Sequence, residues 1–261
     1  MTITKDTGEG TPLVFIHGFA VNSLIMQALE DTIDFSGWRR IYLDLPWTRQ
    51  GLDTSIDSSD AVLSAVEKEL HHYLGEEPFA LVGNSFGAMI ARGLAHQHKD
   101  KVLGLATLAG VFEPISDKRT VPEKSVIVCD SDFISTLGAD KEDFLDISVI
   151  QDQPNYERFK KFVEPGLAEA DSGVLEAISE QYGLSYVPEE QAAERFTAPA
   201  LHLFGKQDHV VGYEDGLKWV NHYERGTFVV LSEAGHNVHL EQPQIVKGLF
   251  ETWLRQMSDG G

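Results

Sequence analysis

Short runs of apolar, β-prone residues recur along the chain, and stretches with helical periodicity separate most of them. Several runs are apolar at consecutive positions, which is typical of strands buried on both faces of a parallel sheet. The six predicted strands are residues 13–17, 40–45, 79–83, 102–108, 200–205 and 227–231, and the four predicted helices are residues 58–74, 88–98, 213–222 and 244–257. Because strands that alternate with helices form a sheet covered by those helices, the sequence predicts an α/β fold with a mostly parallel sheet flanked by helices.

The alternation of strands and helices stops between residues 112 and 196. This stretch is acidic and contains helical patterns at residues 141–151, 156–162, 172–182 and 189–196, with prolines between them. We therefore predict a core formed by residues 1–111 and 197–261, and a helical lid, or cap, formed by residues 112–196. An insertion that leaves a parallel sheet at its carboxyl edge usually covers a binding site. A separately packed helical appendage is the alternative.

The net charge limits the partners that the chain can have. Its 261 residues suit one large α/β domain with an insertion, and its formal charge is −20 at pH 7. Nucleic acids and anionic membranes repel such a chain, so neither is expected as a partner. Solubility is the simplest explanation of the charge, and attraction of a cationic ligand is the alternative.

The cysteine content and the hydropathy pattern bear on the location of the protein. Cys129 is the only cysteine, so no intramolecular disulfide can form and a cytoplasmic location is expected. Cys129 ends a strand-like run, residues 125–129, where we predict a buried apolar role. The N-terminal residues lack a signal-peptide pattern. The longest nearly apolar stretch, residues 102–112, is too short to cross a bilayer and suits a core strand.

A serine stands between two glycines where the third predicted strand gives way to a helix. The segment Gly83-Asn-Ser-Phe-Gly87 matches the G-x-S-x-G nucleophile elbow, a sharp turn that exposes the serine oxygen above the sheet. Larger residues at the two flanking positions would collide with neighbouring main chain. We therefore predict that Ser85 is a nucleophile.

A serine hydroxyl needs a general base to remove its proton, and the base needs an acid to orient it. His236 stands in the loop that follows the last predicted strand, and Asp208 follows the strand before it. Since parallel strands end at one edge of a sheet, we expect Ser85, Asp208 and His236 to meet there as a catalytic triad. A plain turn aspartate is the alternative for Asp208.

Other acidic and histidine residues fit the pattern less well. The rival acids belong to the predicted lid or adjoin it: Glu113, Asp130 and Asp132. No histidines or cysteines have the spacing of a metal site, so we expect neither metal catalysis nor a cofactor.

These motifs together resemble the α/β-hydrolase superfamily, in particular its lid-bearing esterase and lactonase-like branch. The resemblance extends over nearly the whole chain. Its motifs are, in order, Ile16-His-Gly-Phe19, Leu43-Asp-Leu-Pro46, the elbow at Ser85, Asp208 in a G-x-x-D-x-x-V frame, Gly235-His236 and Glu241-Gln-Pro243. The resemblance implies the α/β-hydrolase fold with an inserted lid, and a backbone oxyanion hole formed by the N–H groups of Phe19 and Phe86. It also implies a structural role for His17.

Apolar residues near these motifs are candidates for the substrate pocket. Beside the aromatic rings of Phe19 and Phe86, the candidates are Trp47, Met89, Phe112 and Val210. An apolar residue near a loop also suits the plain core, and for Trp47 we hold both roles open.

The sequence predicts a serine hydrolase that acts on a small carboxylic ester, a lactone or a related acyl compound through an acyl-enzyme. Its expected partner is a small-molecule acyl substrate, and a homodimer is one option for its assembly. A carbon–carbon bond hydrolase or a perhydrolase with the same triad is an alternative. A ligand-binding receptor on the hydrolase fold, without turnover, is another.

Overall fold

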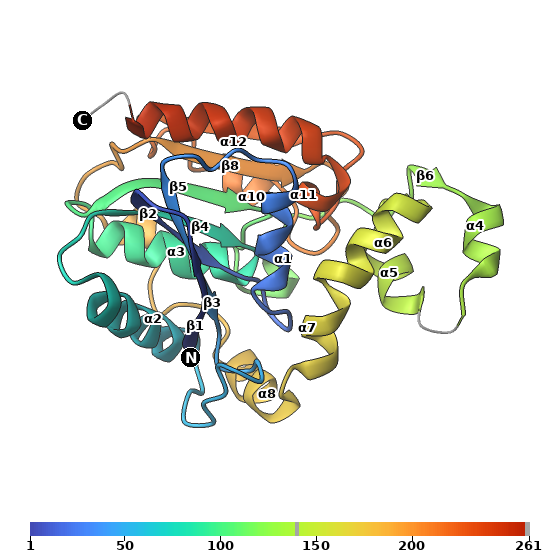
Figure 1. Ribbon diagram of the computed structural model, residues 1–261, viewed down its shortest axis with the longest axis horizontal. Coiled ribbons are helices and arrows are strands. Elements are labelled where there is room, and N and C mark those ends of the chain that lie inside the picture. The colour runs from blue at the N-terminus through green and yellow to red at the C-terminus, as the bar shows by residue number, and fades with distance from the viewer. Residues whose placement is uncertain (139–140, 259–261) are drawn as a thin grey trace.

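The computed structural model describes residues 1–138 and 141–258, and within them a seven-stranded sheet forms the centre of the molecule (Figure 1). The strand order is β1-β3-β2-β4-β5-β8-β9. The strands are β1 (Thr2–Thr7), β2 (Thr11–Ile16), β3 (Trp38–Asp44), β4 (Phe79–Asn84), β5 (Val102–Leu108), β8 (Ala200–Gly205) and β9 (Gly226–Leu231). All neighbours pair in parallel except β1, which runs antiparallel to β3. The predicted α/β fold with a mostly parallel sheet is confirmed.

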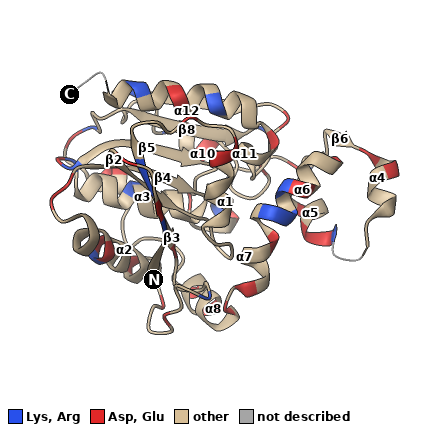
Figure 2. Ribbon diagram, viewed as in Figure 1, with Lys and Arg blue, Asp and Glu red and all other residues tan. Residues whose placement is uncertain are grey.

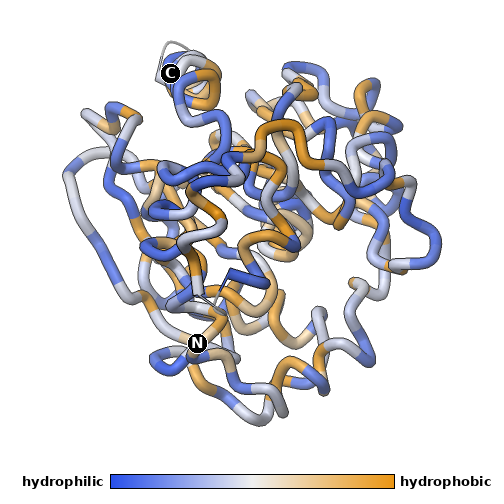
Figure 3. The backbone as a smooth tube through the Cα atoms, turned by 90° about the vertical axis from the view of Figure 1, so that its right-hand side faces the viewer, coloured by the Kyte–Doolittle hydropathy of each residue, from blue (hydrophilic) through white to orange (hydrophobic). Residues whose placement is uncertain are grey.

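The central strands are buried because helices cover both faces of the sheet. Every residue of β4 and of β8 is buried, which agrees with their consecutive apolar residues. Helices α2 (Ser59–Leu74) and α3 (Phe86–Gln97) lie on one face, and α12 (Pro243–Ser258) lies on the other (Figure 1). Figure 3 shows hydrophobic segments gathered in the interior and hydrophilic segments in many outer loops.

Two parts of the core differ from the sequence prediction. Strand β1 was not predicted, because its residues TITKDT form an edge strand and lack an apolar run. The predicted helix at residues 213–222 is reduced to α10 (Glu214–Leu217). The turns after it close through hydrogen bonds between residues three apart instead of four, such as Trp219 N–H to Gly216 O at 3.1 Å and His222 N–H to Trp219 O at 2.8 Å. Short helices α1 (Leu24–Gln27), η1 (Ala28–Asp31) and α11 (Val238–Glu241) complete the core.

Residues 112–196 leave the sheet between β5 and β8, and we call them the insertion. It contains η2 (Ser116–Lys118), β6 (Val128–Cys129), α4 (Ser131–Thr136), α5 (Glu142–Ile147), β7 (Ile150–Gln151), α6 (Gln153–Phe162), α7 (Glu164–Glu169), α8 (Ser172–Glu180) and α9 (Pro188–Gln191). Figure 1 shows α4, α5 and β6 projecting from the core. Strands β6 and β7 form a small parallel ladder. Strand β6 lies in the strand-like run 125–129, whereas β7 lies at the end of the predicted helix 141–151, which is reduced to α5. The prediction of a buried Cys129 was wrong, because both residues of β6, Val128 and Cys129, are exposed.

A buried ion pair fastens the end of the insertion to the core. Arg92 on α3 donates from Nε to one carboxylate oxygen of Glu189 on α9 at 2.7 Å, and from Nη2 to the other at 2.6 Å. Both side chains are buried. Among the residues described, no helix combines the length and apolar character that a bilayer crossing requires.

Candidate active site

The strand order creates a crevice at the carboxyl ends of β2 and β4. These strands are neighbours, and the chain crosses from β3, on one side of β2, to β4 on the other. At such a reversal of strand order the loops diverge, and ligands of open α/β sheets bind there. Gly18 follows β2 and Ser85 follows β4. The two turns lie close together, since a Cβ added to Gly18 would stand 3.2 Å from the Cβ of Ser85.

The turn at Ser85 is strained and tightly enclosed. Ser85 has φ 51° and ψ −114°, a conformation that residues other than glycine rarely adopt. A Cβ added to Gly83 would lie 2.5 Å from the Cα of Ala88, and one added to Gly87 would lie 2.2 Å from the carbonyl oxygen of Ile16. The two glycines therefore let β4, the turn and α3 approach the end of β2.

The structure brings Ser85, His236 and Asp208 into one hydrogen-bonded chain. Ser85 Oγ lies 2.9 Å from His236 Nε2, and His236 Nδ1 lies 3.0 Å from Asp208 Oδ2. The other carboxylate oxygen of Asp208 accepts the N–H groups of Val210 at 2.9 Å and Val211 at 3.0 Å. Because a carboxylate only accepts hydrogen bonds, the proton of the neutral imidazole sits on Nδ1. The Nε2 lone pair then faces the Ser85 hydroxyl and can accept its proton.

Two main-chain N–H groups beside Ser85 have no acceptor in the described part of the chain. They belong to Phe19, in the turn after β2, and to Phe86, the first residue of α3. The N-terminus of a helix such as α3 favours negative charge, so this pair of amides suits an oxyanion. His17 supports the turn: its Nε2 accepts the N–H of Leu45 at 2.9 Å and its Nδ1 lies 2.8 Å from Gly18 O. Burial lowers the pKa of His17 to about 4, so this imidazole is neutral at pH 7.

Glu241 links the loop of His236 to the insertion. One of its carboxylate oxygens accepts the N–H of Gly235 at 2.6 Å. The other accepts the N–H groups of Val149 at 2.7 Å and Ile150 at 3.4 Å, both next to or in β7. Burial raises the pKa of Glu241 to about 7, against the three N–H donors, which favour the charged form.

A cavity of about 200 Å³ opens above Ser85. The core contributes Gly18, Phe19, Val21, Ile25, Asn84, Ser85, His236 and Asn237, and the insertion contributes Asp143, Asp146, Ile147, Phe159, Val163 and Leu167. The serine and the histidine thus come from the core, while six of the fourteen lining residues come from helices α5, α6 and α7 and from Val163 between the last two. Sequence reasoning missed these insertion residues. Phe159, Val163 and Leu167 are four residues apart, a spacing that indicates an apolar helix face but does not show what that face covers.

Four pocket candidates from the sequence do not line this cavity. Trp47 is fully buried, donates from Nε1 to Val21 O at 2.8 Å, and packs against the ring of Phe19. Met89 is buried in α3. Phe112 lies under the guanidinium group of Arg92, 3.9 Å from ring centroid to Cζ. Val210 has its N–H bound to the carboxylate of Asp208. None of these four residues is therefore part of the cavity wall.

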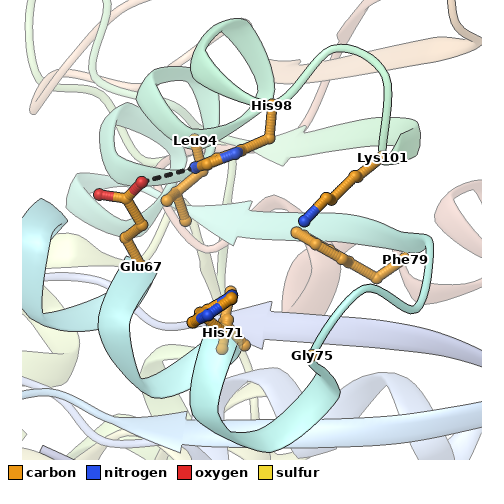
Figure 4. A pocket seen from close by; sticks show the side chains of 8 residues that line it. Glu67, His71, Gly75, Phe79, Leu94, His98 and Lys101 are labelled. Atoms are coloured by element: carbon orange, nitrogen blue, oxygen red, sulfur yellow. Dashed lines mark hydrogen bonds and ion pairs between the residues drawn. The ribbon is translucent and has the colours of Figure 1, made fainter.

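A second, smaller cavity of about 80 Å³ lies at the other end of β4 (Figure 4). It is lined by residues that include Glu67, His71, Phe79, His98 and Lys101, and His98 Nε2 lies 2.8 Å from Glu67 Oε1. Phe79 begins β4 and Ser85 follows its end, so this cavity is separate from the serine site. In the described part of the chain, no three His, Cys, Asp or Glu side chains are grouped so that they could hold a metal ion.

Comparison with known proteins identifies the family. The family model described as alpha/beta hydrolase fold matches residues 11–243, so the chain belongs to the α/β hydrolases. The (E)-2-((N-methylformamido)methylene)succinate hydrolase of Acinetobacter baylyi is 27% identical over 256 residues, which cover 95% of this chain and 92% of that protein. The 2-hydroxymuconate semialdehyde hydrolase of a Pseudomonas species is 26% identical over 262 residues, covering 92% of this chain and 85% of that protein.

Solved structures agree with this assignment. The crystal structure of an alpha/beta superfamily hydrolase from Oenococcus oeni superimposes with a TM-score of 0.88 at 26% identity, covering 97% of this chain and 95% of that one. The protein is therefore an enzyme of the hydrolase class. These two curated relatives are named for different compounds, so the bond that this enzyme cleaves has to be inferred from the site itself.

Proposed function

We propose that the protein is a serine hydrolase of a small carboxylic ester, a lactone or a related acyl compound. The observation that carries this proposal is the hydrogen-bonded chain Ser85–His236–Asp208. Its serine and histidine line the cavity, and two N–H groups beside Ser85 have no acceptor among the described residues. A nucleophile, its base, the acid that orients the base and an oxyanion site are the parts that acyl transfer needs.

In the first half of the reaction, Ser85 Oγ attacks the carbonyl carbon while His236 Nε2 takes the hydroxyl proton. The carbonyl oxygen becomes an oxyanion, which the N–H groups of Phe19 and Phe86 bind. Asp208 stays ionised and stabilises the imidazolium. When the intermediate collapses, His236 gives its proton to the leaving oxygen and the acyl group stays on Ser85.

In the second half, His236 takes a proton from water as the water oxygen attacks the acyl carbon. Collapse of this intermediate breaks the bond to Ser85, and the proton returns from His236 to the serine oxygen, releasing the acid. An oxyanion donor of this kind typically contributes about a hundredfold or more to the rate. The insertion serves as a lid whose apolar side chains, such as Phe159 and Leu167, keep water from the reacting atoms.

A second candidate is a carbon–carbon bond hydrolase, favoured by the likeness to the 2-hydroxymuconate semialdehyde hydrolase. The same groups would serve it, because they activate a carbonyl group and supply a proton to the leaving group. The two reactions differ in the leaving atom, which is oxygen in one and carbon in the other.

The test is hydrolysis of 4-nitrophenyl esters of increasing acyl length, with covalent labelling by a fluorophosphonate probe. The wild type is compared with Ser85→Ala and with Ser135→Ala, a control at an exposed serine of α4. We expect turnover and labelling that Ser85→Ala abolishes and Ser135→Ala retains. Labelling of Ser85 without ester turnover would favour carbon–carbon bond cleavage, another acyl compound or a receptor. A folded wild type with neither signal would refute the serine mechanism.

A further inference from the structure

The charged groups around the cavity are of one sign. Among the described residues that line it, none is a lysine or an arginine, and Asp143 and Asp146 on α5 are both acidic. These two aspartates are exposed, so they stand where the cavity opens to solvent. Figure 2 shows the acidic colour of α5 and the basic colour of the neighbouring α6. The basic residues of α6 do not line the cavity: Lys161 pairs with Asp31 at 2.9 Å, and Lys160 pairs with Glu164.

The two aspartates at the opening have different surroundings. Asp146 pairs with Lys124, which offsets its charge. Asp143 has no ion pair within the described residues, so its charge is uncompensated. His209 is close enough to interact electrostatically with Asp146, but burial lowers the pKa of its imidazole, which is therefore mainly uncharged at pH 7. The opening thus carries a net negative charge, and the overall charge of −20 has the same sign.

An independent observation points to a ligand in this cavity. Asn237, the residue after His236, lines the cavity and is only 4% exposed, yet its side-chain amide makes no hydrogen bond within the described chain. The amide atoms of Asn237 are not completely sealed by protein atoms, so they reach open space. A buried amide without a partner is costly, and a polar group of a bound substrate would satisfy it.

Asn84 adds a second unbonded polar atom. It also lines the cavity, and its Nδ2 donates to Leu108 O at 3.1 Å. The carbonyl oxygen Oδ1 is left without a donor, and it lies near Gly18, because a Cβ added to Gly18 would stand 2.8 Å from it. An amide oxygen accepts hydrogen bonds only. This atom therefore suits an N–H, an O–H or an ammonium group and repels a carboxylate.

Resting on the proposed ester hydrolysis, we propose that the cavity takes acyl compounds that are uncharged or cationic, and that it excludes compounds carrying a carboxylate or another anion. Its apolar wall accepts the hydrocarbon part of the substrate, and the amide of Asn237 binds a polar group without supplying charge. Asp143 determines specificity by attracting a cation at the opening. A carboxylate would find no cationic partner there to replace its lost hydration.

The test uses three butyryl thioesters whose leaving thiols share a two-carbon linker and differ in the charge of the head group. They are butyrylthiocholine as the cation, the 3,3-dimethylbutyl thioester as its uncharged counterpart, and the thioester of 2-mercaptoethanesulfonate as the anion. Thiol release is followed with a disulfide reagent. One close charge pair changes an affinity by about tenfold when its energy is roughly 1.4 kcal/mol. We expect kcat/KM to fall by about this factor or more from the cation to the anion, mainly through KM, and the contrast to shrink with added salt.

Variants of Asp143 and Asn237 test whether these residues cause the difference between the cationic and anionic thioesters. Asp143→Lys should reverse the preference between the cationic and anionic thioesters, whereas Glu142→Gln, an exposed acidic neighbour on α5 that does not line the cavity, should preserve it. Asn237→Asp should make the preference for the cation stronger. Equal or faster hydrolysis of the anion by the wild type, or a preference that Asp143→Lys leaves unchanged, would overturn the proposal. Absence of all hydrolysis and of fluorophosphonate labelling would instead reject the serine mechanism on which it rests.

Discussion

Glu241 offers a direct test of how burial and hydrogen bonding compete at one carboxyl group. Its two oxygens accept three main-chain N–H groups, from Gly235, Val149 and Ile150. In Glu241→Gln, one end of the side chain becomes an NH2 group that must face one of these donors. A buried donor left without an acceptor costs about 1–3 kcal/mol, so we expect this loss of stability under conditions where Glu241 is protonated.

The cost of the substitution should depend on pH in a defined direction. Burial raises the pKa of Glu241 from 4.5 to about 7, so the folded chain binds this proton more tightly than the unfolded chain does. The contribution of the proton is fully present below pH 4.5 and is lost as the pH rises through about 7. Over that range the pKa shift corresponds to a loss of about 3 kcal/mol in the free energy of unfolding of the wild type. Glu241→Gln has no such proton to lose. The difference in the free energy of unfolding between wild type and variant should therefore shrink by a comparable amount and can reverse near pH 8.

The measurement is urea unfolding of wild type and Glu241→Gln at pH 5, 6, 7 and 8, followed by tryptophan fluorescence. The difference between the two proteins is informative because buried histidines such as His17 titrate in both. Glu233→Gln, at an exposed glutamate of the same loop, is the control and should show no such trend. A disadvantage of Glu241→Gln that grows with pH would refute the reasoning, since the three N–H donors would then outweigh burial and hold the carboxylate charged.

Three further predictions test other parts of the structure. Asp208→Asn should lower kcat by about ten-thousandfold with little change in KM, because an amide in this place favours the wrong imidazole tautomer; a loss below tenfold would contradict the triad. Gly87→Ala places a Cβ 2.2 Å from a carbonyl oxygen and should cost about 3 kcal/mol or prevent folding, whereas Gly248→Ala, with no atom within 4 Å, should stabilise α12 by about 0.5–1 kcal/mol; equal unfolding midpoints would count against this. Glu189→Gln leaves the buried Arg92 unpaired and should cost about 3–5 kcal/mol in a urea titration; a change below 1 kcal/mol would show that the ion pair is not needed.

The sequence was sufficient for the parallel strands of the sheet and for the residues at their carboxyl ends. Strands such as β4 and β8 are buried on both faces, so their apolar residues are consecutive and stand out from the chain. Ser85, Asp208 and His236 each follow a strand of a parallel sheet, which fixes them at one edge without knowledge of side-chain packing. Strand β1 escaped prediction because an edge strand with polar residues has no such signal.

The cavity wall could not be predicted, because it depends on how the insertion packs on the core. Ile147, Phe159 and Leu167 are far in sequence from Ser85, and their positions depend on turns between short helices. Trp47 and Phe112 have the size and apolar character of pocket residues, but their contacts in the folded chain keep them out of the cavity wall. Trp47 is anchored by its indole N–H, and Phe112 packs on Arg92.

The contact between Glu241 and β7 has a consequence for building chimeras of this enzyme. Ser85, Asp208 and His236 belong to the core, whereas much of the wall belongs to residues 112–196, so exchanging that block for its counterpart from another hydrolase is a natural route to a new selectivity. Such a graft must also present two main-chain N–H groups where Val149 and Ile150 stand. Without them Glu241 keeps only Gly235 as a donor, and the loop that carries His236 loses its attachment to the transplanted part.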